Sequence, residues 1–281
     1  MIKQYDNETL KKLQKTELEI LKDIKKVCEK HNIGYSIGYG SLIGVVRHKG
    51  FIPWDDDIDL WMFRDEYEKF EKVFDEEMGD KNRLMTPLRE KGYSGNVIKV
   101  MKNGTKFINK HSANQKCNPG IFIDIFIWDK VSKDEKKFKK QARKVRLLAM
   151  LLFLTVSPYP EINISGIVGG VSKTICFIIH YLLKLWPNKE RHLFNMYQKN
   201  CMKANDEETD VYAVYQEPNV RNTIINKNDV VPYIQAEFEG VMVSIPHGYD
   251  KMLSNWYGDY MQLPPEDKRV NHAADVIDFG E

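Results

Sequence analysis

Four carboxylates crowd into one short run of this chain: Asp55, Asp56, Asp57 and Asp59, between Phe-Ile-Pro-Trp and Leu-Trp-Met. Carboxylates held beside bulky apolar residues are costly unless a cation neutralises them. Apolar and polar residues alternate from position 57 to 62, the period of a β-strand. This pattern places Asp57 and Asp59 on one face, where they can share a hard divalent cation: Mg²⁺, with Mn²⁺ as the alternative.

A glycine-rich turn upstream could hold phosphate beside these acids. Residues 35–39 predict a short strand, and Gly40 and Ser41 follow it. Glycine lets backbone N–H groups approach a phosphate closely, and Ser41 adds a hydroxyl donor. Arg47 brings positive charge to the same neighbourhood.

The runs 39–48 and 50–59 together resemble the signature of the LicD family. That family includes bacterial phosphocholine transferases, has fukutin-related proteins as distant relatives, and is part of the nucleotidyltransferase superfamily. The resemblance covers about residues 10–130 and 235–272. It implies that the Gly-Ser turn holds a CDP-linked donor, that the acids hold the metal, and that a phospho-alcohol group passes to a glycan hydroxyl.

Three other interpretations of the acids stay open. The run could be a solvated acidic turn, or the Asp-x-Asp of a nucleotide-sugar glycosyltransferase, which leaves the Gly-Ser turn unexplained. Asp55, Asp57, Asp59 and Glu66 also match an EF-hand calcium loop, although Leu60 stands where that loop needs glycine.

A further carboxylate, that of Asp124, lies within an apolar strand predicted at 120–129. Isoleucines occupy one face, and Asp124 lies on the other with aromatic residues. A buried, unpaired carboxylate is costly, so we expect this strand beside that of Asp57 and Asp59, with Asp124 as the third metal-binding and catalytic acid. Backbone donors at a sheet edge are the alternative partner for Asp124. Asp129 is expected to end the strand in a turn or a helix cap.

Residues 95–109 predict two strands paired through a turn at Asn103-Gly104, a strong hairpin signal. The resemblance to the LicD family suggests a donor-phosphate contact for Lys99. A surface lysine on a strand is the alternative.

Helices are predicted before and after this core in the sequence. Residues 7–31 predict an amphipathic helix without a functional role. The runs 147–156 and 167–186 are strongly apolar, and the first follows a lysine-rich stretch. A buried helical hairpin is expected, and the alternative is interfacial docking, a peripheral membrane contact through residues 133–186.

The C-terminal part predicts strands over 211–245 and then motifs at 256–265 and 269–272 that resemble those of LicD proteins. His272 is a candidate substrate-binding residue.

Net charge and cysteine usage bear on the partners and the cellular compartment of the protein. The net charge of +2 gives no electrostatic case for nucleic acid. The four scattered cysteines suit a reducing compartment, and the polar N-terminus lacks a signal peptide. A cytoplasmic protein is expected, with the inner face of the membrane as a further location.

These observations predict an α/β protein with a mixed sheet: a nucleotidyltransferase-like core with its N-terminal helix (1–130), a helical insertion (131–205) and a C-terminal segment packed on the core (206–281). The predicted activity is metal-dependent transfer of a phospho-alcohol, phosphocholine first, from a CDP-linked donor to a cell-surface glycan or its lipid-linked precursor. Nucleotidyl transfer from an NTP, or metal-dependent binding of nucleotide or glycan without catalysis, are the alternatives.

Overall fold

The structure is a computed structural model that describes residues 4–109, 112–159, 166–271 and 273–280. The side chains of residues 166–168 are also outside the description. His272 therefore lies outside the described residues.

A mixed β-sheet forms the centre of the molecule, with strands β1, β2, β6, β4 and β3 as neighbours in that order. β2 is parallel to β6, and the other pairs are antiparallel. β7 pairs with the carboxyl end of β6 and with β8, which makes seven strands within the described chain. The bounds are β1 Ser36–Ile37, β2 Asp59–Phe63, β3 Asn82–Met85, β4 Ile98–Lys102, β6 Phe122–Lys130, β7 Val211–Val214 and β8 Ile225–Asn226. The α/β class is confirmed.

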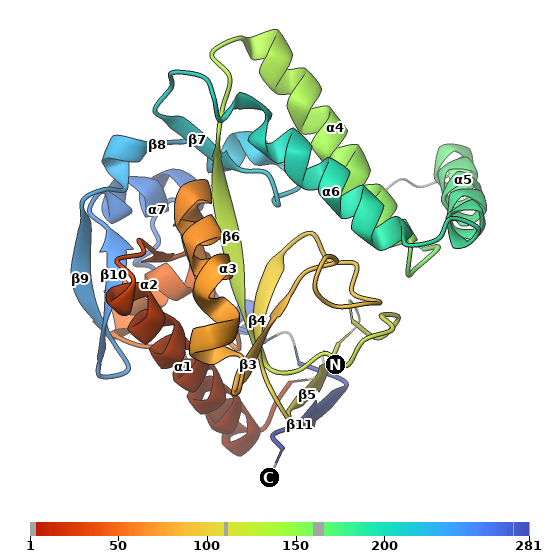
Figure 1. Cartoon of the computed structure of the whole chain (residues 1–281). Coiled ribbons are helices and arrows are strands. Elements are labelled where there is room, and N and C mark those ends of the chain that lie inside the picture. Colours follow the sequence, from red (N-terminus) through yellow and green to blue (C-terminus); the bar gives the residue numbers. More distant parts are fainter. Residues whose placement is uncertain (1–3, 110–111, 160–165, 272, 281) are drawn as a thin grey trace.

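Helices cover both faces of this sheet (Figure 1). α1 (Asn7–Lys30) and α3 (Arg64–Met78) lie against one face, where both contact β6. α2 (Tyr39–His48) and α7 (Tyr249–Tyr257) pack against each other and bring aromatic rings onto Trp61 of β2. The sheet is thus buried on both sides, which explains why β2 and β6 are so apolar.

The alternation predicted for β6 is present. Ile123, Ile125 and Ile127 are fully buried on one face of the sheet. On the other face, Asp124 is followed by Phe126 and Trp128, which lie opposite Trp61 and Phe63 of β2. One face of the sheet therefore carries acids at one end and packed aromatic rings along the rest.

The two strands predicted within 95–109 and the turn between them are confirmed, but the pairing of these strands as a hairpin is wrong. β4 ends at a turn with Gly104 at φ +78°, but β5 (Lys106–Ile108) pairs with β11 (Val276–Asp278) near the C-terminus. β4 already has β3 on one side and β6 on the other, so neither edge is available to β5.

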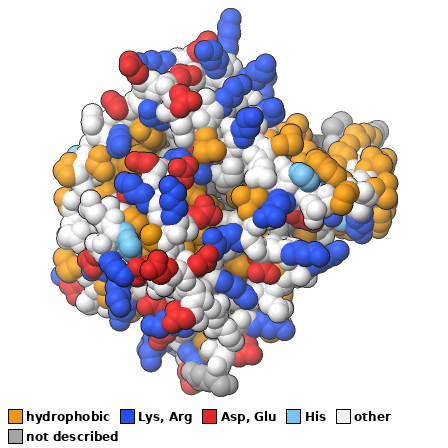
Figure 2. Space-filling model, in the orientation of Figure 1, with side chains coloured by type: hydrophobic (Ala, Val, Ile, Leu, Met, Phe, Trp, Pro, Cys, Tyr) orange, Lys and Arg blue, Asp and Glu red, His pale blue; other side chains and the backbone are white. Residues whose placement is uncertain are grey.

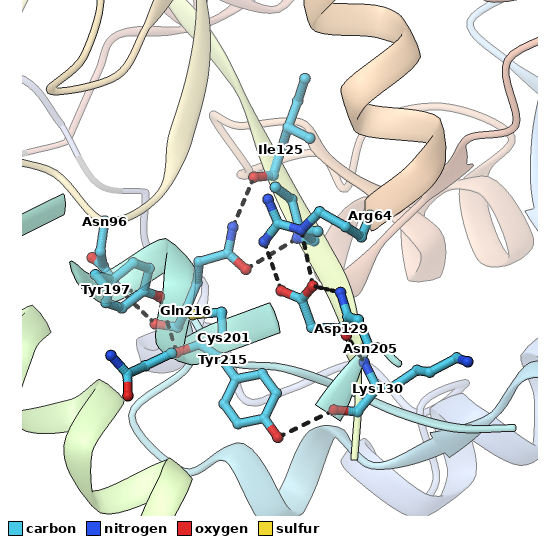
Figure 3. A network of polar contacts seen from close by, with 12 residues as sticks. Arg64, Asn96, Ile125, Asp129, Lys130, Tyr197, Cys201, Asn205, Tyr215 and Gln216 are labelled. Atoms are coloured by element: carbon cyan, nitrogen blue, oxygen red, sulfur yellow. Dashed lines mark hydrogen bonds and ion pairs between the residues drawn. The ribbon is translucent and has the colours of Figure 1, made fainter. Parts of the chain in front are cut away.

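Asp129 was expected to end the strand in a turn or a helix cap; β6 does end at the next residue, Lys130, but Asp129 is neither a turn residue nor a helix cap. It lies inside β6, is buried, and forms a bidentate pair with Arg64 at 2.9 and 2.6 Å (Figure 3). Asn205 donates a further hydrogen bond of 2.8 Å to the same carboxylate. Beside this pair in Figure 3, the Gln216 side chain hydrogen-bonds the backbone of Ile125 and Ile127, in the part of β6 between its partners β4 and β7.

Residues after β6 form a helical region with its own apolar cluster. It consists of α4 (Glu135–Leu154), α5 (Gly166–Lys184) and α6 (Lys189–Cys201). α4 and α6 pack side by side, whereas α5 stands apart at the edge of the molecule (Figure 1). The expected buried hairpin is wrong for α5, because most of its apolar side chains are exposed. Among the described residues, no helix is both long enough and apolar enough to cross a bilayer.

The C-terminal segment packs back on the core. β9 (Tyr233–Phe238) and β10 (Val241–Pro246) form a separate two-stranded sheet. Farther along, the Ala274 N–H donates to the Tyr5 hydroxyl at 2.6 Å, which joins the two ends of the chain.

Candidate functional site

Three adjacent strands present charged side chains in one row across the sheet. Asp59 of β2 lies directly opposite Asp124 of β6, and Asp124 lies opposite Lys99 of β4. Residues paired in this way point to the same face of a sheet. Lys99 forms an ion pair with Asp124, and its Nζ lies 3.4 Å from the centroid of the Phe122 ring. Asp57 lies two residues before Asp59, the first residue of β2, so the row continues into the acidic loop.

The row concentrates negative charge in a poorly solvated place. Burial, then Asp57, Asp124 and Asp55, raise the pKa of Asp59 well above its usual range, and the Lys99 ammonium only partly opposes this. Burial also raises the pKa of Asp124, again against the effect of Lys99. One lysine thus faces several carboxylates, and additional positive charge would stabilise their ionised forms.

Gly40 and Ser41 belong to the first turn of helix α2 rather than to an open turn. A Cβ at Gly40 would lie 3.2 Å from Asp55 Oδ2, so glycine permits the acidic loop to approach the helix. The buried Ser41 hydroxyl accepts a hydrogen bond from the Asp59 N–H at 3.0 Å and is 3.4 Å from the Asp57 carbonyl oxygen. Ser41 therefore positions the acids. N–H groups at a helix start also suit phosphate.

Helix α1 was predicted to be only structural, but it also contacts the acidic loop. Gln14 donates to the Asp55 carbonyl oxygen at 2.8 Å. Glu17 is 2% exposed, and one of its oxygens is buried without a hydrogen-bond partner. Burial, then Asp57, Asp56, Asp55 and Asp124, raise its pKa well above the usual range. Glu17 lies four residues from both Leu13 and Leu21, on the apolar stripe of the helix. This spacing is the sequence signal for the burial of its carboxylate.

Glu17 makes stability depend on pH. Because its pKa in the folded state is raised, its contribution to folding is present below the unfolded-state pKa of about 4.3 and is lost as pH rises through the folded-state value. A Glu17→Gln variant has no carboxylate to ionise at this position, so its stability does not fall in this way as pH rises. We expect it to be more stable than the parent by about 2 kcal/mol near neutral pH, with a difference that shrinks on acidification.

Urea unfolding with a chelator, at about pH 5 and about pH 7.5, measures this difference. Glu19→Gln, at a half-exposed position of the same helix, is the control and should change stability by less than about 0.5 kcal/mol. A Glu17→Gln effect equal at the two pH values would contradict the prediction.

A cavity of about 830 Å³ opens beside the row of charges. Asp57, Lys99 and Asp124 contribute to one wall, and Phe107 and Phe122 lie nearby. The lining also includes polar side chains and apolar residues of the helical region; these are Asn96, Asn109, Ser112, Gln115, Asn271 and Asp275, with Ala149, Phe153 and Val156. A volume of this size accommodates a nucleotide-sized ligand.

Most of these lining residues carry no motif, and sequence reasoning missed them. Residues 93–97 lie before β4, and residues 107, 109, 112, 115 and 119 lie in β5 or after it, so only the tertiary fold brings them to the cavity. The polar residues among them are of types that ordinary surface loops also contain, so the sequence holds no signal for their position.

Arg47 is directed to the C-terminal segment. Its guanidinium donates to the carbonyl oxygens of Tyr260 at 2.8 Å and Gln262 at 3.3 Å, and to His48 Nε2 at 2.9 Å. Burial and the positive charge of Arg269 lower the pKa of Arg47. These bonds attach α2 to the C-terminal segment, and a contact of Arg47 with substrate stays a prediction.

The calcium-loop interpretation of the acids is wrong. Asp59 opens a strand, where an EF-hand loop would continue. Glu66 lies in α3, where its carboxylate accepts from the Gly34 N–H at 2.7 Å and pairs with Lys69.

Comparisons with known proteins show which family the chain resembles. Residues 32–156 match the family model described as LicD/FKTN/FKRP, nucleotidyltransferase domain. The lipopolysaccharide cholinephosphotransferase LicD of Haemophilus influenzae is 33% identical over 269 residues, which cover 94% of this chain and 96% of that protein. Uncharacterized proteins of Rickettsia typhi and Rickettsia prowazekii are 38% and 42% identical over 55 and 48 residues; these cover 20% and 17% of this chain and 18% of each relative. Because the similarity to the first relative extends over nearly the whole of both sequences, this chain belongs to the LicD family.

Proposed function

We propose that this transferase moves a phospho-alcohol group, phosphocholine being the first candidate, from a CDP-linked donor to a hydroxyl of a cell-surface glycan or its lipid-linked precursor. The relative from Haemophilus influenzae, named for cholinephosphate transfer to lipopolysaccharide, supports this choice. The observation that carries the proposal is the row of Asp59, Asp124 and Lys99 beside a cavity of nucleotide size.

Asp57, Asp59 and Asp124 would hold Mg²⁺, or Mn²⁺. Their oxygen atoms are the donors these ions prefer, and burial together with the neighbouring carboxylates raises the pKa of Asp59. Within the described residues, no three acidic, histidine or cysteine side chains are already arranged around a common ion position. Lys99 pairs with Asp124 instead, so metal binding requires the carboxylates to reorient. When bound, the ion would neutralise phosphate oxygens and stabilise the leaving nucleotide.

The residues of the chain suggest how the transfer proceeds. The acceptor hydroxyl oxygen forms a bond to the phosphorus that carries the alcohol, and the bond from that phosphorus to the bridging oxygen breaks, releasing CMP. The hydroxyl proton passes to a carboxylate oxygen of Asp124, which lines the cavity. Lys99 holds Asp124 in place before substrate binds.

The start of α2, with Gly40 and Ser41, would bind the donor diphosphate through backbone N–H groups, and Lys99 and Arg47 would supply positive charge. We expect the reaction on the cytoplasmic side, at the inner face of the membrane when the acceptor is lipid-linked. His272 stays a predicted substrate contact.

The test is a panel of CDP-alcohols incubated with the protein, an acceptor glycan and Mg²⁺, with CMP measured as the product. We expect CMP release with one CDP-alcohol, CDP-choline first, and no release in the presence of a chelator. Release of pyrophosphate from an NTP would instead support nucleotidyl transfer. Binding of nucleotide without turnover would support a non-catalytic protein.

Asp124→Asn tests the proton acceptor. We expect kcat to fall by about 100-fold or more, with little change in the Kd of the donor, because asparagine cannot accept the proton. The acidic limb of the kcat profile against pH should disappear with it. Lys99→Met, which removes the partner and keeps the base, should have a smaller effect on kcat. A loss confined to donor affinity would refute this role for Asp124.

A further inference from the structure

Helix α5 carries an apolar stripe on its outer side. Val171, Ile175, Ile178, Leu182 and Leu185, which follows the helix, recur at helical spacing and are 54%, 51%, 51%, 60% and 80% exposed. We call these five residues the outer stripe. A helix surface facing water normally carries polar side chains, so a continuous aliphatic stripe indicates a contact with something apolar.

The opposite side of α5 fixes the helix to the rest of the molecule. Cys176, His180 and Leu183 are buried in the helical region. His180 Nδ1 lies 2.7 Å from the carbonyl oxygen of Leu154, the last residue of α4. The outer stripe is therefore held in one orientation, with its side chains exposed, on a helix at the edge of the molecule (Figure 1).

Basic residues accompany this apolar surface, on α5 itself and on α4. Between residues 147 and 188 the sequence has a single carboxylate, Glu161, whereas Lys173 and Lys184 lie exposed on α5 itself. On α4, every charged side chain from Lys136 to Arg146 is basic and exposed. Figure 2 shows hydrophobic side chains gathered over α5 and lysine and arginine side chains over α4. The combination suits a surface of apolar chains below anionic headgroups.

The same features disfavour a second copy of this chain as the partner. Two outer stripes packed together would bring the lysines of both α5 helices, and the basic surfaces of both α4 helices, close to one another. Like charges at an interface oppose association. An α5 that spans a bilayer does not fit either, because His180 and Lys184 would enter the apolar layer.

We infer that α5 docks in the interface of an anionic lipid bilayer, lying flat with the outer stripe inserted and with the basic residues of α4 and α5 near the headgroups. α4 links this surface to the cavity, since Ala149, Phe153 and Val156 at its end line the cavity wall. If the acceptor is lipid-linked, which rests on the proposed function, docking brings its glycan to the cavity. The docking itself does not depend on that function.

Vesicle flotation of the full chain tests this inference. We expect the protein to float with vesicles of phosphatidylcholine mixed with phosphatidylglycerol, and to bind vesicles of phosphatidylcholine alone at least about tenfold more weakly. The triple variant Ile175→Ser, Ile178→Ser, Leu182→Ser should lose at least about tenfold in binding to the mixed vesicles. These side chains are exposed, so the fold should stay intact, and circular dichroism checks this.

The matched control replaces three apolar residues exposed elsewhere, Ile234, Met242 and Val276, which are 39%, 50% and 44% exposed, with serine. It should float as the parent does. Equal loss in both triple variants, or no flotation of the parent, would overturn the inference. A parent dimer in sedimentation that the α5 triple variant abolishes would assign the stripe to a second copy instead.

Asp59→Asn separates docking from catalysis. This variant, expected to be inactive, should float as well as the parent, because Asp59 lies in the sheet. For the parent protein, failure to float with intact CMP release would refute the membrane surface alone, and flotation without CMP release from any CDP-alcohol would refute only the proposed function.

Discussion

An Asp59→Asn variant should lose about a thousandfold or more in turnover, which corresponds to about 4 kcal/mol of transition-state stabilisation. Asp59 lies at the centre of the row of charges, between the acidic loop and Asp124. Asparagine keeps the shape of the side chain but removes the charge that would hold the metal. Because burial and neighbouring carboxylates already raise the pKa of Asp59, the neutral substitute should fold at least as well as the parent.

CMP release and Mg²⁺ titration calorimetry on the same preparations measure this effect. The variant should lose both activity and metal binding, while its thermal unfolding temperature in a chelator stays equal to or above that of the parent. Asp80→Asn, at an exposed turn after α3, is the matched control and should keep full activity. Turnover within about threefold of the parent would refute the assignment of Asp59 to the metal.

An Arg64→Met variant should lose about 3–5 kcal/mol of unfolding free energy. Its side chain and that of Asp129 are 13% and 2% exposed, so methionine would leave a buried carboxylate whose remaining side-chain contact is the amide of Asn205 (Figure 3). The raised pKa of Arg64, which Asp129 causes against the effect of burial, reflects the same dependence.

Urea unfolding near neutral pH measures this loss. Arg89→Met breaks an ion pair with Asp75, whose side chain is 73% exposed, and should cost less than about 1 kcal/mol. The double variant Arg64→Met, Asp129→Leu should recover part of the stability, since no buried charge is left. Similar losses from Arg64→Met and Arg89→Met would show that the buried pair is no more important than a surface pair.

The sequence by itself determined the features that depend on local pattern. Alternation along 120–129 separates the isoleucine face from the face of Asp124, because successive side chains of a strand point to opposite sides. The cost of burying a lone carboxylate then requires that this strand lie near other charged groups, and β6 indeed lies beside β2. The resemblance over residues 39–59 indicated the family that the comparisons show.

Only the tertiary structure decided which distant segments meet. Asn103-Gly104 predicts a turn, but the partner of β5 is β11, because β4 is occupied on both edges. The sequence around Asp129 does not predict that Arg64 is its ion-pair partner. The sequence of α1 does not predict that Glu17 lies beside the acidic loop. The apolar run of α5 has the composition of a core helix, yet only one side of it is buried. Side-chain pattern determines that a face must be covered, whereas packing between segments far apart in the chain determines what covers it.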